Sequence, residues 1–398
     1  MSLPLAVDPW SPATPATAGD VFSLIRDGRA VTRSDVGRLT GLSRTAVAAR
    51  LSVLLDSGLV VEAGDGTSTG GRPAGRLRFN RDAGVVLAAA IGRSRTQLGV
   101  CDLDGGVLAT LDLEQEVGPG AAELLPRVVD GLATLLERTG RPAGSVRAVG
   151  LSIPGSVDFA RGASLDSPAM TGWEGIELAP HLRGLVGQAP VFVDNDANVM
   201  ALSERRGHLE RYRDLLFVKA STGLGVGIVS AGQVLRGARG AAGEIGHTRT
   251  PAAEGLPCRC GDTGCVETLA GGWALVQAAR ERGRHVDHVR DLVAQANRGD
   301  AEARHAVREA GRRLGEPLAV AVNLLNPEAV VVGGDLAGAY ELFVAGLRES
   351  VYSQASAPAT RELRIVPVTH GEQSGVVGCA AMAVSEILDS VAVDRALA

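Results

Sequence analysis

The chain of 398 residues contains a single lysine, Lys219, against 39 arginines, and only 3% of its residues are aromatic. Because arginine is preferred over lysine along the whole chain, we interpret this preference as a bias of overall composition and not as a sign of function. No apolar run approaches the roughly 18 residues that a membrane helix needs, and the N-terminus lacks the basic flank and apolar core of a signal peptide. Five cysteines, three of them within eight residues, give no disulfide framework. We therefore expect a cytoplasmic protein with no membrane partner.

Length and charge distribution indicate several domains. A chain of this length is typical of two or three domains, and 45% hydrophobic residues suffice for sizeable cores. Residues 1–19, rich in proline and small residues, predict a disordered arm. Residues 20–80 carry nine arginines and six acidic residues, a net charge of +3, so residues 81–398 must hold −7 once Asp8 is counted. A basic segment on an acidic body favours a nucleic-acid-binding head.

Residues 31–62 have the pattern of a helix-turn-helix. Thr32 and Ser43 can each cap a helix, and Gly41 supplies the turn between them. The second helix has an apolar stripe at helical spacing, made of Val47, Leu51, Leu54 and Leu55. Its outward face is small and polar and carries Arg44, Thr45, Ala48 and Ser52, and a major groove admits such a helix.

The glycine-rich residues 64–80 predict a hairpin that returns through Leu77 and Phe79, the wing of a winged helix. Its tip would present Arg72 to a narrow minor groove, where arginine is electrostatically favoured. The alternative for residues 20–80 is a helical protein-interaction module. We favour a winged helix-turn-helix that binds double-stranded operator DNA, because the caps, turn, stripe and wing all agree.

Residues 243–267 contain the densest group of metal-ligating side chains. Imidazole and thiolate ligands at this spacing can close a tetrahedral, structural zinc site, and the predicted ligands are His247, Cys258, Cys260 and Cys265. The alternative is that these cysteines are merely buried small hydrophobic residues. Two carboxylates, Glu244 and Glu267, flank the ligands. Carboxylates accept hydrogen bonds from hydroxyls strongly, so they suit a polyhydroxylated ligand.

The run GEIGH followed by CxCGxxGCxE in this segment resembles the signature of the ROK family of repressors, open reading frames and sugar kinases. The resemblance extends over nearly the whole chain from about residue 20. It implies a mixed α/β protein, with an N-terminal winged helix-turn-helix and a two-lobed actin/hexokinase-like body. It places a small lobe at residues 81–195 with the C-terminal helix 375–398, and a large lobe with the zinc loop at residues 196–374.

The family resemblance also implies a sugar site. The turn 154–158 is similar to the family's sugar-side turn and includes Gly155. Residues 193–198 resemble the family's catalytic segment, in which Asp196 matches the catalytic base and follows Asn195. The alternative for Asp196 is a helix N-cap. Together with the residues above, the candidate sugar contacts are Gly155, Asn195, Asp196, Glu244, His247 and Glu267.

One segment departs from the family's kinases. Their first phosphate loop reads DxGGTK, whereas the equivalent run here has Ala90, Gly92, Arg93 and Ser94. Ala90 offers no acceptor oxygen, and Arg93 is bulky where the backbone must approach phosphate closely. Glycine turns at residues 221–227 and 333–335 resemble the family's other nucleotide loops, but a strand-to-helix turn also requires glycine.

We therefore expect a sugar-responsive transcriptional regulator, most simply a repressor, with no catalytic residues. It would be a homodimer or a dimer of dimers on an inverted repeat, released by a sugar or sugar phosphate. The first alternative is an active, glucokinase-like sugar kinase that carries a DNA-binding domain, with Asp196 as its base. The second alternative is a repressor whose signal is a protein partner.

Overall fold

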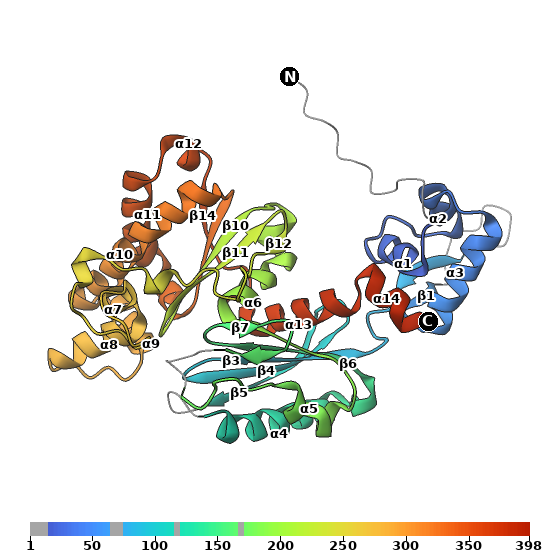
Figure 1. Cartoon of the computed structure of the whole chain (residues 1–398), viewed down its shortest axis with the longest axis horizontal. Coiled ribbons are helices and arrows are strands. Elements are labelled where there is room, and N and C mark those ends of the chain that lie inside the picture. Colours follow the sequence, from blue (N-terminus) through green and yellow to red (C-terminus); the bar gives the residue numbers. More distant parts are fainter. Residues whose placement is uncertain (1–14, 64–74, 115–119, 166–170) are drawn as a thin grey trace. The chain divides into compact units, whose positions relative to one another are not determined.

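The computed structural model describes residues 15–63, 75–114, 120–165 and 171–398. They form two compact units (Figure 1). The first unit, here called the head, comprises residues up to Val85, the short segment Asp102–Gly106 and the C-terminal Val384–Ala398. The second unit, here called the body, comprises Val86–Cys101 and Val107–Ala383.

Three helices and a two-stranded sheet make up most of the head. They are α1 (Ala18–Arg26), α2 (Arg33–Thr40), α3 (Arg44–Asp56), β1 (Val60–Ala63) and β2 (Arg76–Phe79). As predicted, Thr32 and Ser43 cap α2 and α3, and each side chain accepts a backbone N–H from three residues further on. Gly41 ends α2 with a φ of 70°, which glycine adopts without strain. The head is therefore a winged helix-turn-helix, whose wing tip lies outside the described residues.

The core of the head is small and includes an unexpected C-terminal element. Phe22 is fully buried and meets Phe79 edge-on, with ring centroids 5.6 Å apart. A last helix, α14 (Ser390–Leu397), packs on α1: the Gly19 N–H donates to the Asp394 carboxylate at 2.7 Å. A Cβ on Gly19 would collide with the carbonyl of Ser390, so the two helices need glycine here.

Three expectations about the head and the ends of the chain were wrong in detail. The arm predicted for residues 1–19 overlaps a helix, because Thr17 caps α1, which already begins at Ala18. The C-terminal helix predicted for residues 375–398 is two helices, and the second belongs to the head. In the apolar stripe of α3, Val47, Leu51 and Leu54 are buried, but Leu55 is only partly buried.

The first lobe of the body is built on a five-stranded sheet in the order β5-β4-β3-β6-β9. Its strands are β3 (Val85–Ile91), β4 (Arg95–Asp102), β5 (Val107–Glu114), β6 (Val146–Ile153) and β9 (Val191–Asn195). Figure 1 shows α4 (Ala121–Thr139) and α5 (Ala179–Val186) on one face of this sheet and α13 (Ser374–Ile387) on the other. Gly150 of β6 faces the backbone of Cys379, so α13 lies directly on the sheet, as expected.

The second lobe is built on another five-stranded sheet, in the order β12-β11-β10-β13-β14. Its strands are β10 (Leu215–Ala220), β11 (Leu224–Ser230), β12 (Gln233–Val234), β13 (Ala329–Gly333) and β14 (Arg364–Pro367). Side chains of β10 alternate between two cores, as the strand period requires: Leu216 and Val218 face one, and Leu215 and Phe217 face the other.

Helices cover both faces of the second sheet. One face packs against a large apolar cluster carried by α8 (Gly272–Glu281), α9 (Val289–Asn297), α10 (Ala301–Leu325) and α11 (Tyr340–Gln354). The other face packs against α6 (Asp196–Ser203), which begins where β9 of the first lobe ends. A Cβ on Gly227 of β11 would collide with the Ala197 carbonyl. This close approach fixes α6 against both β10 and β11, and thereby ties the first lobe to the second.

The body has the predicted two-lobed, mixed α/β fold. Within the described residues no single helix is long and apolar enough to cross a membrane. One bent pair of helices, Gly371–Ile387 and Ser390–Leu397, is together long and apolar enough by length and composition alone.

Candidate functional site

A cavity of about 230 Å³, here called the small cavity, is lined by loops from both lobes of the body. All six residues predicted to contact a sugar line it: Gly155, Asn195, Asp196, Glu244, His247 and Glu267. Its volume lies below the roughly 300–1,000 Å³ of sites for drug-sized ligands. The small cavity therefore suits one compact, polar molecule.

The turn from β9 into α6 places Asp196 at the cavity wall. The N-cap of α6 is Asn195, whose Oδ1 accepts from Ala197 N–H at 2.8 Å and whose Nδ2 donates to the Gly155 carbonyl at 2.9 Å. Because Asn195 caps the helix, the side chain of Asp196 is available for a different partner. That partner is Lys219 of β10, which donates from Nζ to Oδ2 at 2.5 Å.

A buried ion pair holds this turn from behind. Asp194 has only 3% of its side chain exposed and pairs with Arg236 at 2.7 Å. Its other oxygen accepts from Asn198 Nδ2 at 2.9 Å, and the Arg236 guanidinium lies 3.8 Å from the ring centroid of Phe159. These contacts satisfy Asp194 completely, so Asp194 orients the turn and does not act on a ligand.

The second lobe contributes two carboxylates of different character. Glu267 is buried, and its oxygens accept from Leu224 N–H at 2.8 Å and Trp273 Nε1–H at 3.0 Å. Glu244 has a looser environment, with Oε2 3.9 Å from Nε2 of His247. Burial raises the pKa of the Glu244 carboxyl, and the neighbouring His247 opposes that shift.

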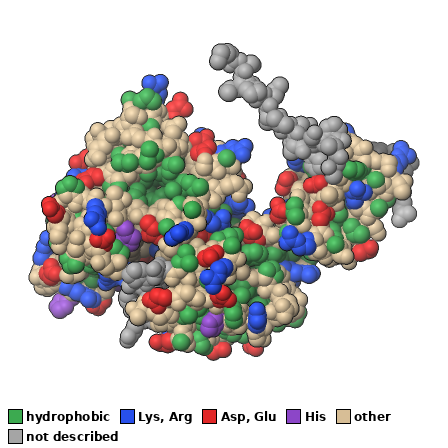
Figure 2. Space-filling model, in the orientation of Figure 1, with side chains coloured by type: hydrophobic (Ala, Val, Ile, Leu, Met, Phe, Trp, Pro, Cys, Tyr) green, Lys and Arg blue, Asp and Glu red, His purple; other side chains and the backbone are tan. Residues whose placement is uncertain are grey.

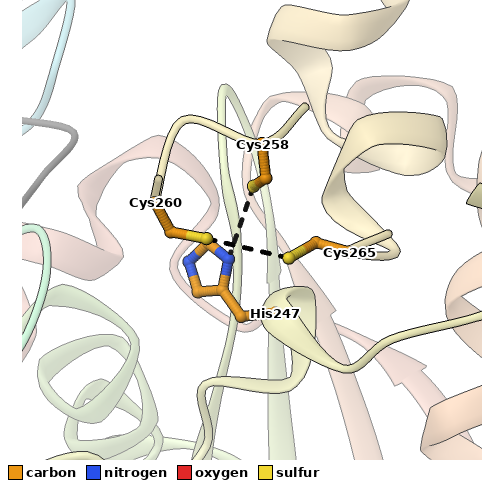
Figure 3. Close-up of side chains that lie close together, drawn as sticks. All are labelled: His247, Cys258, Cys260 and Cys265. Atoms are coloured by element: carbon orange, nitrogen blue, oxygen red, sulfur yellow. Dashed lines mark hydrogen bonds between the residues drawn. The ribbon is translucent and has the colours of Figure 1, made fainter. Parts of the chain in front are cut away.

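Beside this cavity, one imidazole and three thiols converge (Figure 3). Their ligand atoms all lie within 4.8 Å of one another, and they belong to His247, Cys258, Cys260 and Cys265. Cys258 Sγ lies 3.7 Å from His247 Nδ1, and Cys260 Sγ lies 3.7 Å from Cys265 Sγ. A tetrahedron with metal–ligand distances of about 2.3 Å has edges of about 3.8 Å, so the spacing and the donor set fit a Zn²⁺ ion.

A second cavity, of about 530 Å³ and here called the large cavity, adjoins the small one. Arg93, Asp196, Lys219 and Gly223 line both. Ala90 and Ser94, from the run predicted to correspond to the first phosphate loop, also line the large cavity. Ser94 Oγ lies 3.0 Å from His288 Nε2, so its hydroxyl is already bound within the protein.

The recognition face predicted on α3 is open to solvent. Arg44, Thr45, Ala48 and Ser52 are all exposed. The remaining predicted DNA contact, Arg72, lies outside the described residues. On the face of the body visible in Figure 2, basic and acidic side chains are interspersed and form no extended basic surface.

The ROK family model matches residues 86–386, which is most of the chain and nearly all of the body. The chain belongs to the ROK family. A xylose repressor of Caldicellulosiruptor bescii is 28% identical over 385 residues, covering 92% of this chain and 95% of the relative. A solved ROK family transcriptional regulator, a homologue of the E. coli MLC protein, has a TM-score of 0.79 at 26% identity and covers 96% of this chain and 98% of its own.

A ROK kinase matches a smaller part of the chain. The ROK family glucokinase from Streptomyces griseus, solved with glucose and AMPPNP, has a TM-score of 0.66 at 30% identity. It covers 75% of this chain but 99% of its own. The family model likewise begins only at residue 86, directly after the winged helix-turn-helix. The ROK regulators therefore share the head as well as the body, whereas the kinase matches three quarters of the chain.

Sequence reasoning missed three polar residues of this ROK body. Lys219 was set aside as a matter of composition, yet it forms the ion pair with Asp196. Arg259, between two predicted zinc ligands, lines the small cavity and lies 4.6 Å from the ring centroid of Trp273. His288 binds Ser94 of the first lobe from the N-terminus of α9. Only Lys219 carried a usable signal, because it is the sole lysine of the chain.

Proposed function

We propose that this chain is a sugar-responsive transcriptional regulator of the ROK family, a repressor that leaves its operator when a sugar occupies the small cavity. The observation that carries the proposal is the combination in one chain of a winged helix-turn-helix and a polar cavity lined by all six candidate sugar contacts. The full-length similarity to a xylose repressor supports it. The protein would act in the cytoplasm, where operator DNA is accessible.

The small cavity offers what a monosaccharide needs. Asp196 and Glu244 supply carboxylate oxygens for sugar hydroxyls, and such charge-assisted hydrogen bonds are about twice as strong as neutral ones. His247 turns Nδ1 toward the thiols and Nε2 toward Glu244, so it can bind a metal and face the ligand with different nitrogens. A Zn²⁺ ion held by the four ligands would fix this loop, and its role would be structural because all four positions are taken.

The same site is poorly suited to phosphoryl transfer. A general base must be free to accept the proton of the attacking hydroxyl, but Asp196 is held by Lys219 at 2.5 Å. Ala90 supplies no oxygen toward metal-bound phosphates, and the side chain of Arg93 lines both cavities at the place where phosphate would be cradled. We infer that the protein binds sugar without phosphorylating it.

DNA binding is assigned to the exposed face of α3 and to the wing. As a homodimer, the protein would present two recognition helices to an inverted repeat, with half-sites about one helical turn apart or a multiple of that. Arg44 and Thr45 would contact bases, and Arg72 would enter the minor groove. A sugar that touches both lobes stabilises one arrangement of the body, and coupling of this kind typically changes operator affinity by roughly 5- to 150-fold.

The test is operator affinity with and without sugar. A symmetric operator selected from random DNA would be titrated with the full-length protein, at fixed salt, in the presence of a panel of free and phosphorylated aldoses. We expect at least one member of the panel to weaken operator binding within the coupling range above. Selection of no symmetric sequence, or release by none of the sugars, would count against the proposal.

The alternative is an active sugar kinase, and the similarity to a glucokinase at 30% identity favours testing it. A coupled assay with ATP, Mg²⁺ and each sugar that binds would decide between the two functions. Turnover near the common enzyme range of roughly 1–10³ per second would establish the kinase. We expect none above the rate of a control lacking protein.

A further inference from the structure

Arg93 lies at the junction of the two cavities without an ion pair within the described residues. It sits in the turn between β3 and β4 and lines both the small and the large cavity. Its Nε is buried without a hydrogen-bond partner, and within the described residues its guanidinium forms no ion pair. An uncompensated buried guanidinium is costly, so such a group normally has an anionic partner.

Three of the acidic groups nearby have other partners. Asp196 is neutralised by Lys219, and the oxygens of Glu267 accept hydrogen bonds from Leu224 and Trp273. In the large cavity, Glu372 pairs with Arg95 at 3.0 Å. Within the described residues no carboxylate forms an ion pair with Arg93, although the charges of Glu267 and Asp196 favour its charged form at longer range.

A second arginine approaches the same cavity. Arg259 projects from the loop between Cys258 and Cys260, and its guanidinium stacks on Trp273 rather than pairing with an acid of the described chain. Burial lowers the pKa of Arg93, the like charge of Arg259 lowers it further, and the charges of Glu267 and Asp196 oppose the shift. Two guanidinium groups that repel one another across a polar cavity are stabilised together when an anion enters between them.

We propose that the effector is a phosphorylated monosaccharide, with its ring in the small cavity and its phosphate bound by Arg93 and Arg259. This proposal rests on the proposed function, since it names the ligand class of the same site. Guanidinium groups match phosphate oxygens with paired, parallel N–H donors, and a phosphate has enough oxygens for two of them. The phosphate of the effector would occupy the side of the junction that faces the small cavity.

One arginine of the chain serves as a control for where the anion binds. Arg290 lines only the large cavity and, like Arg93, forms no ion pair within the described residues; its Nε donates to His288 Nδ1 at 3.2 Å. If the anion sat deep in the large cavity, as a nucleotide would, Arg290 would bind it. If the anion is the phosphate of a sugar in the small cavity, substitution of Arg290 leaves its affinity unchanged.

The experiment measures ligand binding by calorimetry with the full-length protein. The ligands are glucose, mannose and xylose, their monophosphates, and glucuronate as a carboxylate analogue. The variants are Arg93→Gln, Arg93→Lys, Arg259→Gln and Arg290→Gln. We expect a monophosphate to bind the parent protein more tightly than its free sugar. Arg93→Gln should reduce that preference by roughly 10- to 100-fold, since hydrogen bonds to charged groups are strong. Arg259→Gln should reduce it less, Arg93→Lys should restore part of it, and Arg290→Gln should not change it.

Each other outcome contradicts the proposal in a recognisable way. If free sugars bind and release the operator while their phosphates bind no better, the phosphate assignment fails and the proposed function stands. If glucuronate binds more tightly than every sugar phosphate, the bound anion is a carboxylate and the phosphate assignment is overturned. Loss of affinity in Arg290→Gln but not in Arg259→Gln would move the anion into the large cavity. Binding of no sugar and no sugar phosphate would overturn the proposed function as well.

Discussion

The small and large cavities share four residues, but their side chains differ in how closely they match those expected of the family's kinases. Around the small cavity, the side chains expected for a sugar are present, supported by the buried Asp194–Arg236 pair and the cysteine cluster. Around the large cavity the glycine turns remain, but Ala90 and Arg93 stand where the family resemblance implies an aspartate and a glycine. We therefore expect the sugar side of the body to match the family's kinases and the phosphate side to depart from them.

The glycine turns of the large cavity have structural reasons of their own. A Cβ on Gly92 would lie 2.7 Å from the Arg95 carbonyl, and Gly334 has a φ of 90° with the Ala220 carbonyl 2.5 Å from where its Cβ would be. Packing alone demands glycine at both places. Backbone glycines therefore persist whether or not a nucleotide binds, and the side chains Ala90 and Arg93 are the more informative positions.

The largest effect is expected from removing a ligand of the predicted metal site beside the small cavity. Cys258→Ser removes one of four ligands, and we expect zinc to fall well below one per chain and sugar binding to be lost, while the head still binds DNA. Metal analysis and calorimetry measure this. Cys101→Ala is the control, because it removes a buried cysteine far from the cluster in sequence and should keep the metal. A parent protein purified without chelator that holds no zinc would contradict the prediction.

The next effect separates sensing from DNA binding. Asp196→Asn keeps the size of the side chain but removes the charge that sugar hydroxyls need. We expect unchanged operator affinity without ligand, and loss of the roughly 5- to 150-fold release that the effector causes. Fluorescence anisotropy with labelled operator measures both quantities, with Glu341→Gln on the exposed side of α11 as a matched control. Normal release by the Asp196→Asn protein would show that the small cavity is not the sensor.

A smaller effect tests the head alone. Arg44→Ala should weaken operator binding by roughly 5-fold or more and relax the preferred sequence, if Arg44 contacts a base. Arg29→Ala removes an equally exposed arginine that is not on α3 and should leave sequence preference intact. Equal losses in both variants would mean that Arg44 contributes only general electrostatic attraction, which the salt dependence of binding would reveal.

The helix-turn-helix and six of the residues that line the small cavity could be predicted, because helix caps, apolar periodicity and the family motifs can be recognised in short stretches of sequence. What could not be predicted depends on tertiary contacts. Lys219 meets Asp196 only because β10 and the start of α6 are brought together by packing. Likewise, α14 has an ordinary amphipathic sequence, and only its contact with Gly19 in α1 assigns it to the head.

The smallest effect concerns pH and links the two lobes at His288. Two N–H groups of Arg290 donate to its Nδ1, so the imidazole is neutral with its proton on Nε2, which donates to Ser94 Oγ. Burial lowers the pKa of His288 below 6.5, helped by Arg290 and Arg95 and opposed by Asp335 and Asp291. The unfolded chain therefore binds a proton more readily than the folded one below about pH 6.5.

Stability should consequently decrease as the pH falls below about 6.5, and this contribution stops changing once the pH is below the pKa of the folded protein. One such group changes the free energy of unfolding by at most about 1.4 kcal/mol per pH unit. Urea unfolding between pH 7.5 and 5.5 measures the slope in the parent and in His288→Asn, whose amide can still cap α9. We expect a shallower slope in the variant. An identical slope would place the acid sensitivity of the body elsewhere, and the hydrogen bond from His288 to Ser94 would then be a contact between lobes without a titration of its own.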